Sequence, residues 1–226
     1  MIPLKDDNPT NSKPIVSYSI IGICIVVFFL ELSSPGYRTG ELFFSYGLIP
    51  SVLIGSVQLP DDVYAVPASV TIFTSMFMHG GFMHLIGNML YMWIFADNIE
   101  DGLGRTKFII FYLLSGLGAA MSQVFVDINS QVPMVGASGA IAGVLGAYMI
   151  KFPRAKVHVF AVIIIFVTTF IVPAQVVLGL WFLMQLSSGL SSLGIDTTGG
   201  VAWFAHIGGF LVGIGSLKIF QTFHLK

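Results

Sequence analysis

The sequence predicts an all-α polytopic membrane protein, a bundle of six transmembrane helices, and two observations support this fold class. Of the 226 residues, 55% are hydrophobic and 9% are charged, whereas soluble domains carry about 25% charged residues. Apolar runs of about 20 residues, long enough to cross a bilayer, recur along the chain. The formal net charge of −1 argues against a nucleic-acid partner.

The candidate spans define one domain with short polar ends. We predict spans at residues 15–32, 82–99, 107–126 and 135–152, within 157–193, and at 201–220. Residues 1–14 form a polar leader without a small-residue cleavage site after the first apolar run, so the first span is expected to be retained. The domain covers residues 15–220, and residues 221–226 form a tail.

The first loop, residues 33–79, is long and contains apolar patches at 42–44 and 47–50. We expect this loop to pack on the bundle or to enter the outer interface. Cys24 is the single cysteine, and it lies in an apolar run where a buried, inert thiol is typical.

The run at residues 157–193 is too long for one ordinary span and is interrupted at Pro173. It can form two crossings, or one crossing that begins near Pro173 after a segment lying partly in the interface. Cytoplasmic loops carry an excess of Lys and Arg, and a single crossing leaves only Arg38 outside. The cytoplasmic group is then Lys5, Lys13, Arg105, Lys107, Lys151, Arg154, Lys156, Lys218 and Lys226. Six spans with both termini in the cytoplasm are therefore favoured.

Ser138 and His206 each lie near the start of a predicted span. Ionisable groups at membrane depth are costly, so an intramembrane histidine suggests a functional site. A serine and a histidine are also the minimum equipment for nucleophilic catalysis. The two side chains share a depth only if an odd number of crossings separates their helices, which again favours one crossing in 157–193.

Glycines accompany both residues and predict how their helices meet. Gly136 and Gly139 flank Ser138, and Gly209 follows His206 by three positions, on the same helix face. Small residues permit close helix packing, so we expect the fourth and sixth spans to touch. Singly, Ser138 can be one more small residue at a packed interface, and His206 can be a buried histidine bonded to a carbonyl. Together they favour a reactive pair.

The second span opens with a group of polar side chains. His84 and Asn88 are four residues apart, so they lie on one helix face, and both can donate hydrogen bonds. Two donors on one face suit an oxyanion hole. The alternative is that they form polar contacts between helices. Taken without the other motifs, this pair favours that alternative.

No Asp or Glu lies in the interior of a predicted span, so a carboxylate that orients His206 is not expected. A hydrolase would then use a Ser–His pair rather than a Ser-His-Asp triad. A zinc site with His79, His84 and His206 is the chemical rival, but His79 and His84 are five apart and the sequence lacks H-E-x-x-H. We therefore expect neither a metal nor another cofactor.

The order and spacing of these residues resemble the rhomboid family of intramembrane serine proteases over the whole chain. The resemblance is carried by His79, His84 and Asn88, by Gly136-Ala137-Ser138-Gly139, by Ala205-His206-Ile207-Gly208-Gly209, and by Gly102-Leu103-Gly104-Arg105 after the second span. The prokaryotic form with a six-span core is the most similar. A multi-pass location in a prokaryotic inner membrane is implied.

The resemblance also implies a role for each residue. Ser138 would be the nucleophile, and His206 would be the general base and later the acid. The oxyanion would be bound by His84, Asn88 and the Ser138 N–H, with His79 and the glycines 136, 139 and 209 as supporting residues. Substrates would be single-span membrane proteins, cut near the external end of their helix. The resemblance leaves the oligomeric state open.

The sequence departs from the family pattern in two places. Val70 and Thr71 stand where many relatives carry Trp-Arg in the first loop, and Ala142 stands where some place an aromatic ring against the histidine. His206 would then be oriented by Ser138 and by helix packing. The glycine-containing loop 194–200 is a candidate lid over the approach to His206, or else an ordinary flexible connection.

Two other classes of protein compete with a protease. A non-catalytic relative that binds and escorts membrane proteins would lack the serine or the histidine, and both are present. A small transporter would show repeated halves or a charged group at the midplane, and the sequence shows neither.

Overall fold

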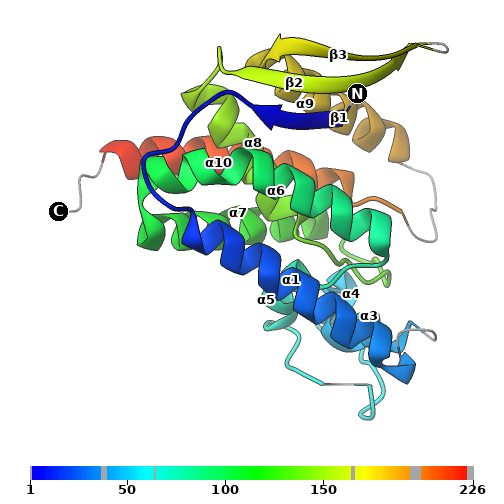
Figure 1. Cartoon of the computed structure of the whole chain (residues 1–226). Coiled ribbons are helices and arrows are strands. Elements are labelled where there is room, and N and C mark those ends of the chain that lie inside the picture. The colour runs from blue at the N-terminus through cyan, green and yellow to red at the C-terminus, as the bar shows by residue number, and fades with distance from the viewer. Residues whose placement is uncertain (1, 37–39, 64, 164–165, 194–199, 223–226) are drawn as a thin grey trace.

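The computed structural model describes residues 2–36, 40–63, 65–163, 166–193 and 200–222. The bundle seen in Figure 1 is built from the longest helices of this part of the chain. They are α1 (Ile15–Ser33), α6 (Phe82–Leu103), α7 (Arg105–Val126), α8 (Ser138–Lys151), α9 (Ala174–Ser192) and α10 (Trp203–Thr222). The predicted helical membrane bundle is confirmed.

Four of these helices, α1, α7, α9 and α10, are long and apolar enough to cross a membrane. Helix α8 is apolar but has only 14 residues, and most of its side chains are buried among its neighbours. Helix α6 has 22 residues and is more polar, because it carries His84, Asn88, Asp97 and Asn98. The chain is therefore embedded in a lipid bilayer, with α8 enclosed by protein.

The long first loop folds against the segment that precedes α8. It contains α3 (Glu41–Tyr46), α4 (Pro50–Leu53), α5 (Thr71–Thr74) and the 3-10 helix η1 (Ser75–Phe77). Leu48 and Met134 exchange backbone hydrogen bonds of 3.0 and 2.8 Å, and the Gly136 N–H donates to the Ser75 carbonyl oxygen at 2.8 Å. These bonds hold the chain in place just before Ser138.

A three-stranded antiparallel sheet is the feature that the sequence did not predict. Its order is β1 (Ile2–Asp6), β2 (Lys156–Ile163), β3 (Phe166–Pro173), and β2 pairs with β3 from Lys156↔Pro173 to Ile163↔Phe166. In Figure 1 it covers one side of the bundle, where β1 contacts α6 and the hairpin contacts α9.

The segment 157–172, which we expect to lie partly in the interface, folds as a β-hairpin. The segment is rich in Val, Ile, Thr and Phe, which favour strands. A continuous apolar run does not distinguish a strand from a helix by its periodicity, so the hydropathy pattern alone was ambiguous. The helix α9 starts directly after Pro173, as the single-crossing interpretation requires.

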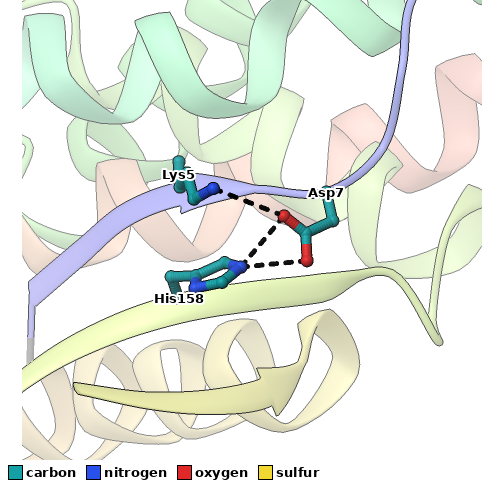
Figure 2. A network of polar contacts seen from close by, with 3 residues as sticks. All are labelled: Lys5, Asp7 and His158. Atoms are coloured by element: carbon teal, nitrogen blue, oxygen red, sulfur yellow. Dashed lines mark hydrogen bonds and ion pairs between the residues drawn. The ribbon is translucent and has the colours of Figure 1, made fainter.

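The N-terminal segment is tied to the sheet and to α6. The Asp7 carboxylate lies between Lys5 Nζ, at 3.7 Å, and His158 Nε2, at 2.9 Å, as Figure 2 shows. The hydrogen bond with His158 lowers the pKa of Asp7 below its usual value. The Glu100 carboxylate accepts the Val16 and Ser17 N–H groups at 2.9 and 2.8 Å. These two N–H groups belong to the first turn of α1, where a helix leaves its donors unpaired.

Helices α8 and α10 approach each other until their backbones touch. A Cβ atom added to Gly213 would lie 2.1 Å from the Gly143 carbonyl oxygen, and one added to Gly146 would lie 2.3 Å from the Phe210 carbonyl oxygen. Only glycine permits this separation. The predicted contact between the fourth and sixth apolar helices is present.

Candidate active site

Ser138 is the first residue of α8. The first N–H groups of a helix have no acceptor within the helix, so the Ser138 N–H is free to bind another group. Gly136, two residues earlier, has φ of +125°, a conformation that favours glycine because it lacks Cβ. This turn places the Ser138 hydroxyl at the start of α8, beside α10.

His206 lies in the first turn of α10, and its Nε2 is 2.8 Å from Ser138 Oγ. The two residues are 68 positions apart in the chain, and the glycine contact between α8 and α10 brings them together. A distance of about 2.6–3.2 Å is what proton transfer between a nucleophile and its base requires.

Gln185 of α9 contacts the other nitrogen of His206, and the sequence analysis missed it. Its Oε1 lies 2.7 Å from His206 Nδ1. The signal was present, because a lone glutamine inside an apolar span is costly unless it is hydrogen-bonded. A neutral amide can accept from an imidazole N–H as a carboxylate does.

Aromatic rings from α9 and α10 surround the His206 imidazole. The Trp181 ring centroid lies 5.9 Å from that of His206, and the Trp203 ring meets it edge-on at 6.3 Å. Ala142, where an aromatic was missing from the sequence, is buried in α8. The rings near the histidine therefore come from α9 and α10, not from α8.

His84 and Asn88 face the turn before Ser138. A Cβ atom added to Gly136 would lie 2.6 Å from His84 Nε2 and 3.6 Å from Asn88 Nδ2. The Gly80 N–H donates to His84 Nδ1 at 3.3 Å, so the His84 proton is on Nε2, which faces Gly136. Asn88 Nδ2 is buried and has no hydrogen-bond partner among the described residues. Both side chains present an N–H donor to the same space.

His79 lies before α6 and is fully buried. Its Nδ1–H donates to the Phe77 carbonyl oxygen at 3.2 Å, and its backbone N–H donates to Glu31 Oε2 at 3.3 Å. Its ring meets the His84 ring edge-on at 5.1 Å. His79 thus packs behind His84. Glu31, near the end of α1, therefore contacts His79.

The remaining supporting glycines lie at helix contacts. Gly139 would place a Cβ atom 2.5 Å from Ala119 Cβ of α7, and Gly209 would place one 2.0 Å from the Gly139 carbonyl oxygen. Val70 and Thr71, which stand where many relatives carry Trp-Arg, lie at the start of α5 in the first loop. The Thr71 hydroxyl donates to the Ala68 carbonyl oxygen at 2.6 Å.

A cavity of about 690 Å³ joins these groups. Its lining includes His84, Asn88, Ser138 and His206, so the hydroxyl, the imidazole and the two side-chain donors open into one space. Gly200 lines it as well, while the rest of the candidate lid, residues 194–199, lies outside the described residues. Within the described ranges, no group of three His, Cys, Asp or Glu side chains could hold a metal ion.

Comparison with known proteins agrees with this geometry. A family model described as "Rhomboid domain" matches residues 67–221. "Rhomboid protein 1, mitochondrial" of Saccharomyces cerevisiae is 31% identical over 210 residues, which cover 91% of this chain and 53% of the yeast protein. "Rhomboid protease GluP" of Bacillus subtilis is 31% identical over 140 residues, 62% of this chain and 25% of the relative.

A further relative is "Presenilin-associated rhomboid-like protein A, mitochondrial" of Danio rerio, 37% identical over 87 residues that cover 38% of this chain and 23% of that protein. The chain therefore spans about half the length of the yeast relative and a smaller part of the other two. The match to the family model covers more than half of the chain, including both Ser138 and His206. The chain belongs to the rhomboid family.

Proposed function

We propose that the chain is an intramembrane serine endopeptidase with a Ser138–His206 dyad. The observation that carries the proposal is the 2.8 Å contact between Ser138 Oγ and His206 Nε2, inside a cavity that also holds two N–H donors. Membership of a family in which one relative is named a protease supports it further.

The reaction begins when His206 Nε2 takes the proton of the Ser138 hydroxyl and Oγ attacks the scissile carbonyl carbon. The carbonyl oxygen becomes an oxyanion, which accepts hydrogen bonds from His84 Nε2–H, Asn88 Nδ2–H and the Ser138 N–H. One such donor in a site shielded from water contributes about 2.7–4 kcal/mol to the barrier reduction.

The tetrahedral intermediate then breaks the C–N bond. His206 gives its proton to the leaving amine, and an acyl-enzyme ester remains on Ser138. A water molecule from the cavity gives a proton to His206 and attacks the ester. The second intermediate collapses, releases the new carboxyl terminus and returns the proton to Ser138.

The proposed substrates are single-span membrane proteins, cut near the external end of their transmembrane helix. Ser138 and His206 both lie in the first turn of a helix, so the site is at one end of the bundle and not at its midplane. A substrate helix must unwind locally to reach it, because the amides of an intact helix are bonded to one another.

The proposed location is a prokaryotic inner membrane, with both termini in the cytoplasm. The excess of Lys and Arg on one side of the spans supports this orientation. The bacterial relative supports the choice of membrane, whereas the yeast relative is named as mitochondrial.

The test is cleavage of a single-span substrate by the purified chain in liposomes, together with labelling by a fluorophosphonate probe. We expect labelling at Ser138 and cleavage by the wild type. Both should be lost in Ser138→Ala and His206→Ala, which should keep the thermal stability of the wild type. A folded wild type that binds the substrate but neither cuts it nor takes up the probe would instead indicate a non-catalytic binding protein.

A further inference from the structure

The catalytic histidine has a second partner that a dyad does not need. Gln185 lies in α9, outside the family motifs on which the proposed function rests. Its Oε1 is 2.7 Å from His206 Nδ1, shorter than the 2.8 Å contact between Nε2 and Ser138. The imidazole is thus held from both sides, by α8 and by α9.

The chemistry of the two contacts decides which ring nitrogen carries the proton. An amide oxygen only accepts hydrogen bonds, so His206 Nδ1 carries the hydrogen in this contact. In the neutral ring, Nε2 then has a lone pair that faces the Ser138 hydroxyl. This is the tautomer that a general base needs, because the opposite one would point an N–H at Ser138.

The burial of Gln185 indicates that its hydrogen bond with His206 is part of the packed interior. Gln185 is 6% exposed, and it is the one buried polar side chain of α9. Burying an amide in apolar surroundings costs free energy unless its polar atoms are bonded. Trp181, four residues earlier and on the same helix face, packs against the same imidazole.

A neutral amide suits this depth better than a carboxylate. A buried carboxylate carries a large desolvation cost, whereas an amide oxygen orients the ring without adding charge. We propose that Gln185 is a positioning residue, which fixes the orientation and the tautomer of His206 so that Nε2 is the base. This inference rests on the proposed function. It adds α9 to α8 and α10, the helices that carry the proposed dyad.

The experiment compares three variants of the full chain in liposomes with a single-span substrate. Gln185→Met removes the acceptor at similar volume. Gln185→Glu restores an acceptor at the same position. Gln175→Met makes the same change at an exposed residue of α9, ten positions earlier, and is the matched control.

We expect Gln185→Met to lower kcat with little change in KM, because the substrate still binds. General-base catalysis contributes roughly 10²- to 10⁴-fold, and misorientation of the base forfeits part of this, so we expect a loss of about 10- to 100-fold. Gln185→Glu should recover part of the loss, because its carboxyl group still accepts from His206 Nδ1–H but carries the desolvation cost of a buried charge. Gln175→Met should match the wild type.

Two kinetic outcomes would overturn the proposal. One is a Gln185→Met enzyme with the kcat of the wild type. The other is equal loss in Gln185→Met and Gln185→Glu, in step with a fall in thermal stability, since that pattern indicates packing alone.

A measurement without substrate separates this inference from the proposed function. The ¹⁵N chemical shifts of the His206 ring report its tautomer. We expect protonated Nδ1 in the wild type and a mixture in Gln185→Met. If the wild type does not cleave any substrate, the proposed function fails, while these shifts still decide whether Gln185 sets the tautomer. Unchanged shifts in Gln185→Met would overturn the inference.

Discussion

A Cβ atom on Gly209 would lie 2.0 Å from the carbonyl oxygen of Gly139. The backbones of α8 and α10 therefore touch one residue after Ser138 and three residues after His206. The distance between hydroxyl and imidazole is set by this contact and not by the loops that join the helices. Substitutions at the glycine interface should consequently act on the reaction from outside the cavity.

Gly213→Ala should destabilise the protein by about 3 kcal/mol or more, since overpacking against rigid backbone is at the costly end of such changes. Its Cβ would lie 2.1 Å from the Gly143 carbonyl oxygen, so α10 must shift away from α8. The shift should also reduce fluorophosphonate labelling of Ser138. Thermal unfolding and labelling rate are the measurements.

The control for that change is Gly215→Ala in the same helix, where an added Cβ meets nothing within 4 Å. It should leave labelling unchanged and raise stability by up to about 1 kcal/mol, because alanine favours a helix over glycine. Equal behaviour of the two variants would show that the close contact does not set the site geometry.

Gly136→Ala should abolish most of the activity. Residue 136 has φ of +125°, and the new Cβ would lie 2.6 Å from His84 Nε2, so it displaces the oxyanion donor. The backbone strain alone should cost about 1–3 kcal/mol of stability. Gly179→Ala in α9, with nothing within 4 Å of its Cβ, should retain both activity and stability. Substrate cleavage at a temperature well below unfolding checks the first expectation.

Asn88→Ala should lower kcat but more mildly than Ser138→Ala, by roughly 10²- to 10³-fold, as for other oxyanion donors. Asn88 Nδ2 is buried, and no residue in the described part of the chain bonds to it, so its removal should not reduce stability and can increase it slightly. The measurement is kcat beside the melting temperature. A large fall in melting temperature with unchanged kcat would assign Asn88 to helix packing instead.

Acidification should change the stability of the N-terminal strand β1 through two neighbouring carboxyl groups, and the two effects should have opposite signs. Burial raises the pKa of Asp6 above 3.8, so its protonation favours the folded strand as the pH falls towards 3.8. The bond to His158 lowers the pKa of Asp7 below 3.8, so its contribution is present above that value and is lost as the pH falls through the lowered pKa.

Amide hydrogen exchange in β1, corrected for the intrinsic rate at each pH, should therefore show rising and then falling protection during acidification. Asp7→Asn should remove the fall, and Asp6→Asn should remove the rise. Identical profiles for the wild type and Asp7→Asn would contradict the assignment.

The helices were predictable because their signals are local. An apolar run of bilayer length needs no knowledge of its partners, and the glycines beside Ser138 and His206 predicted which two helices meet. The hairpin at 156–173 was not, because the periodicity of an apolar run does not separate a strand from a helix and the pairing partners of a strand can be distant in the chain. One of these partners is β1, about 150 residues away. Gln185 was missed for a related reason, since one polar residue in a span does not indicate which side chain it contacts.

The pairing of β1 with β2 has a consequence for the timing of assembly. Asp7 and His158 are 151 positions apart. Because synthesis proceeds at roughly 5–20 residues per second, β1 is made on the order of ten seconds before β2. During this interval the backbone N–H and C=O groups of β1 lack their partners in β2, while the first helices are already entering the lipid. Closure of the sheet is therefore a late event, and it completes only after the hairpin emerges from the ribosome.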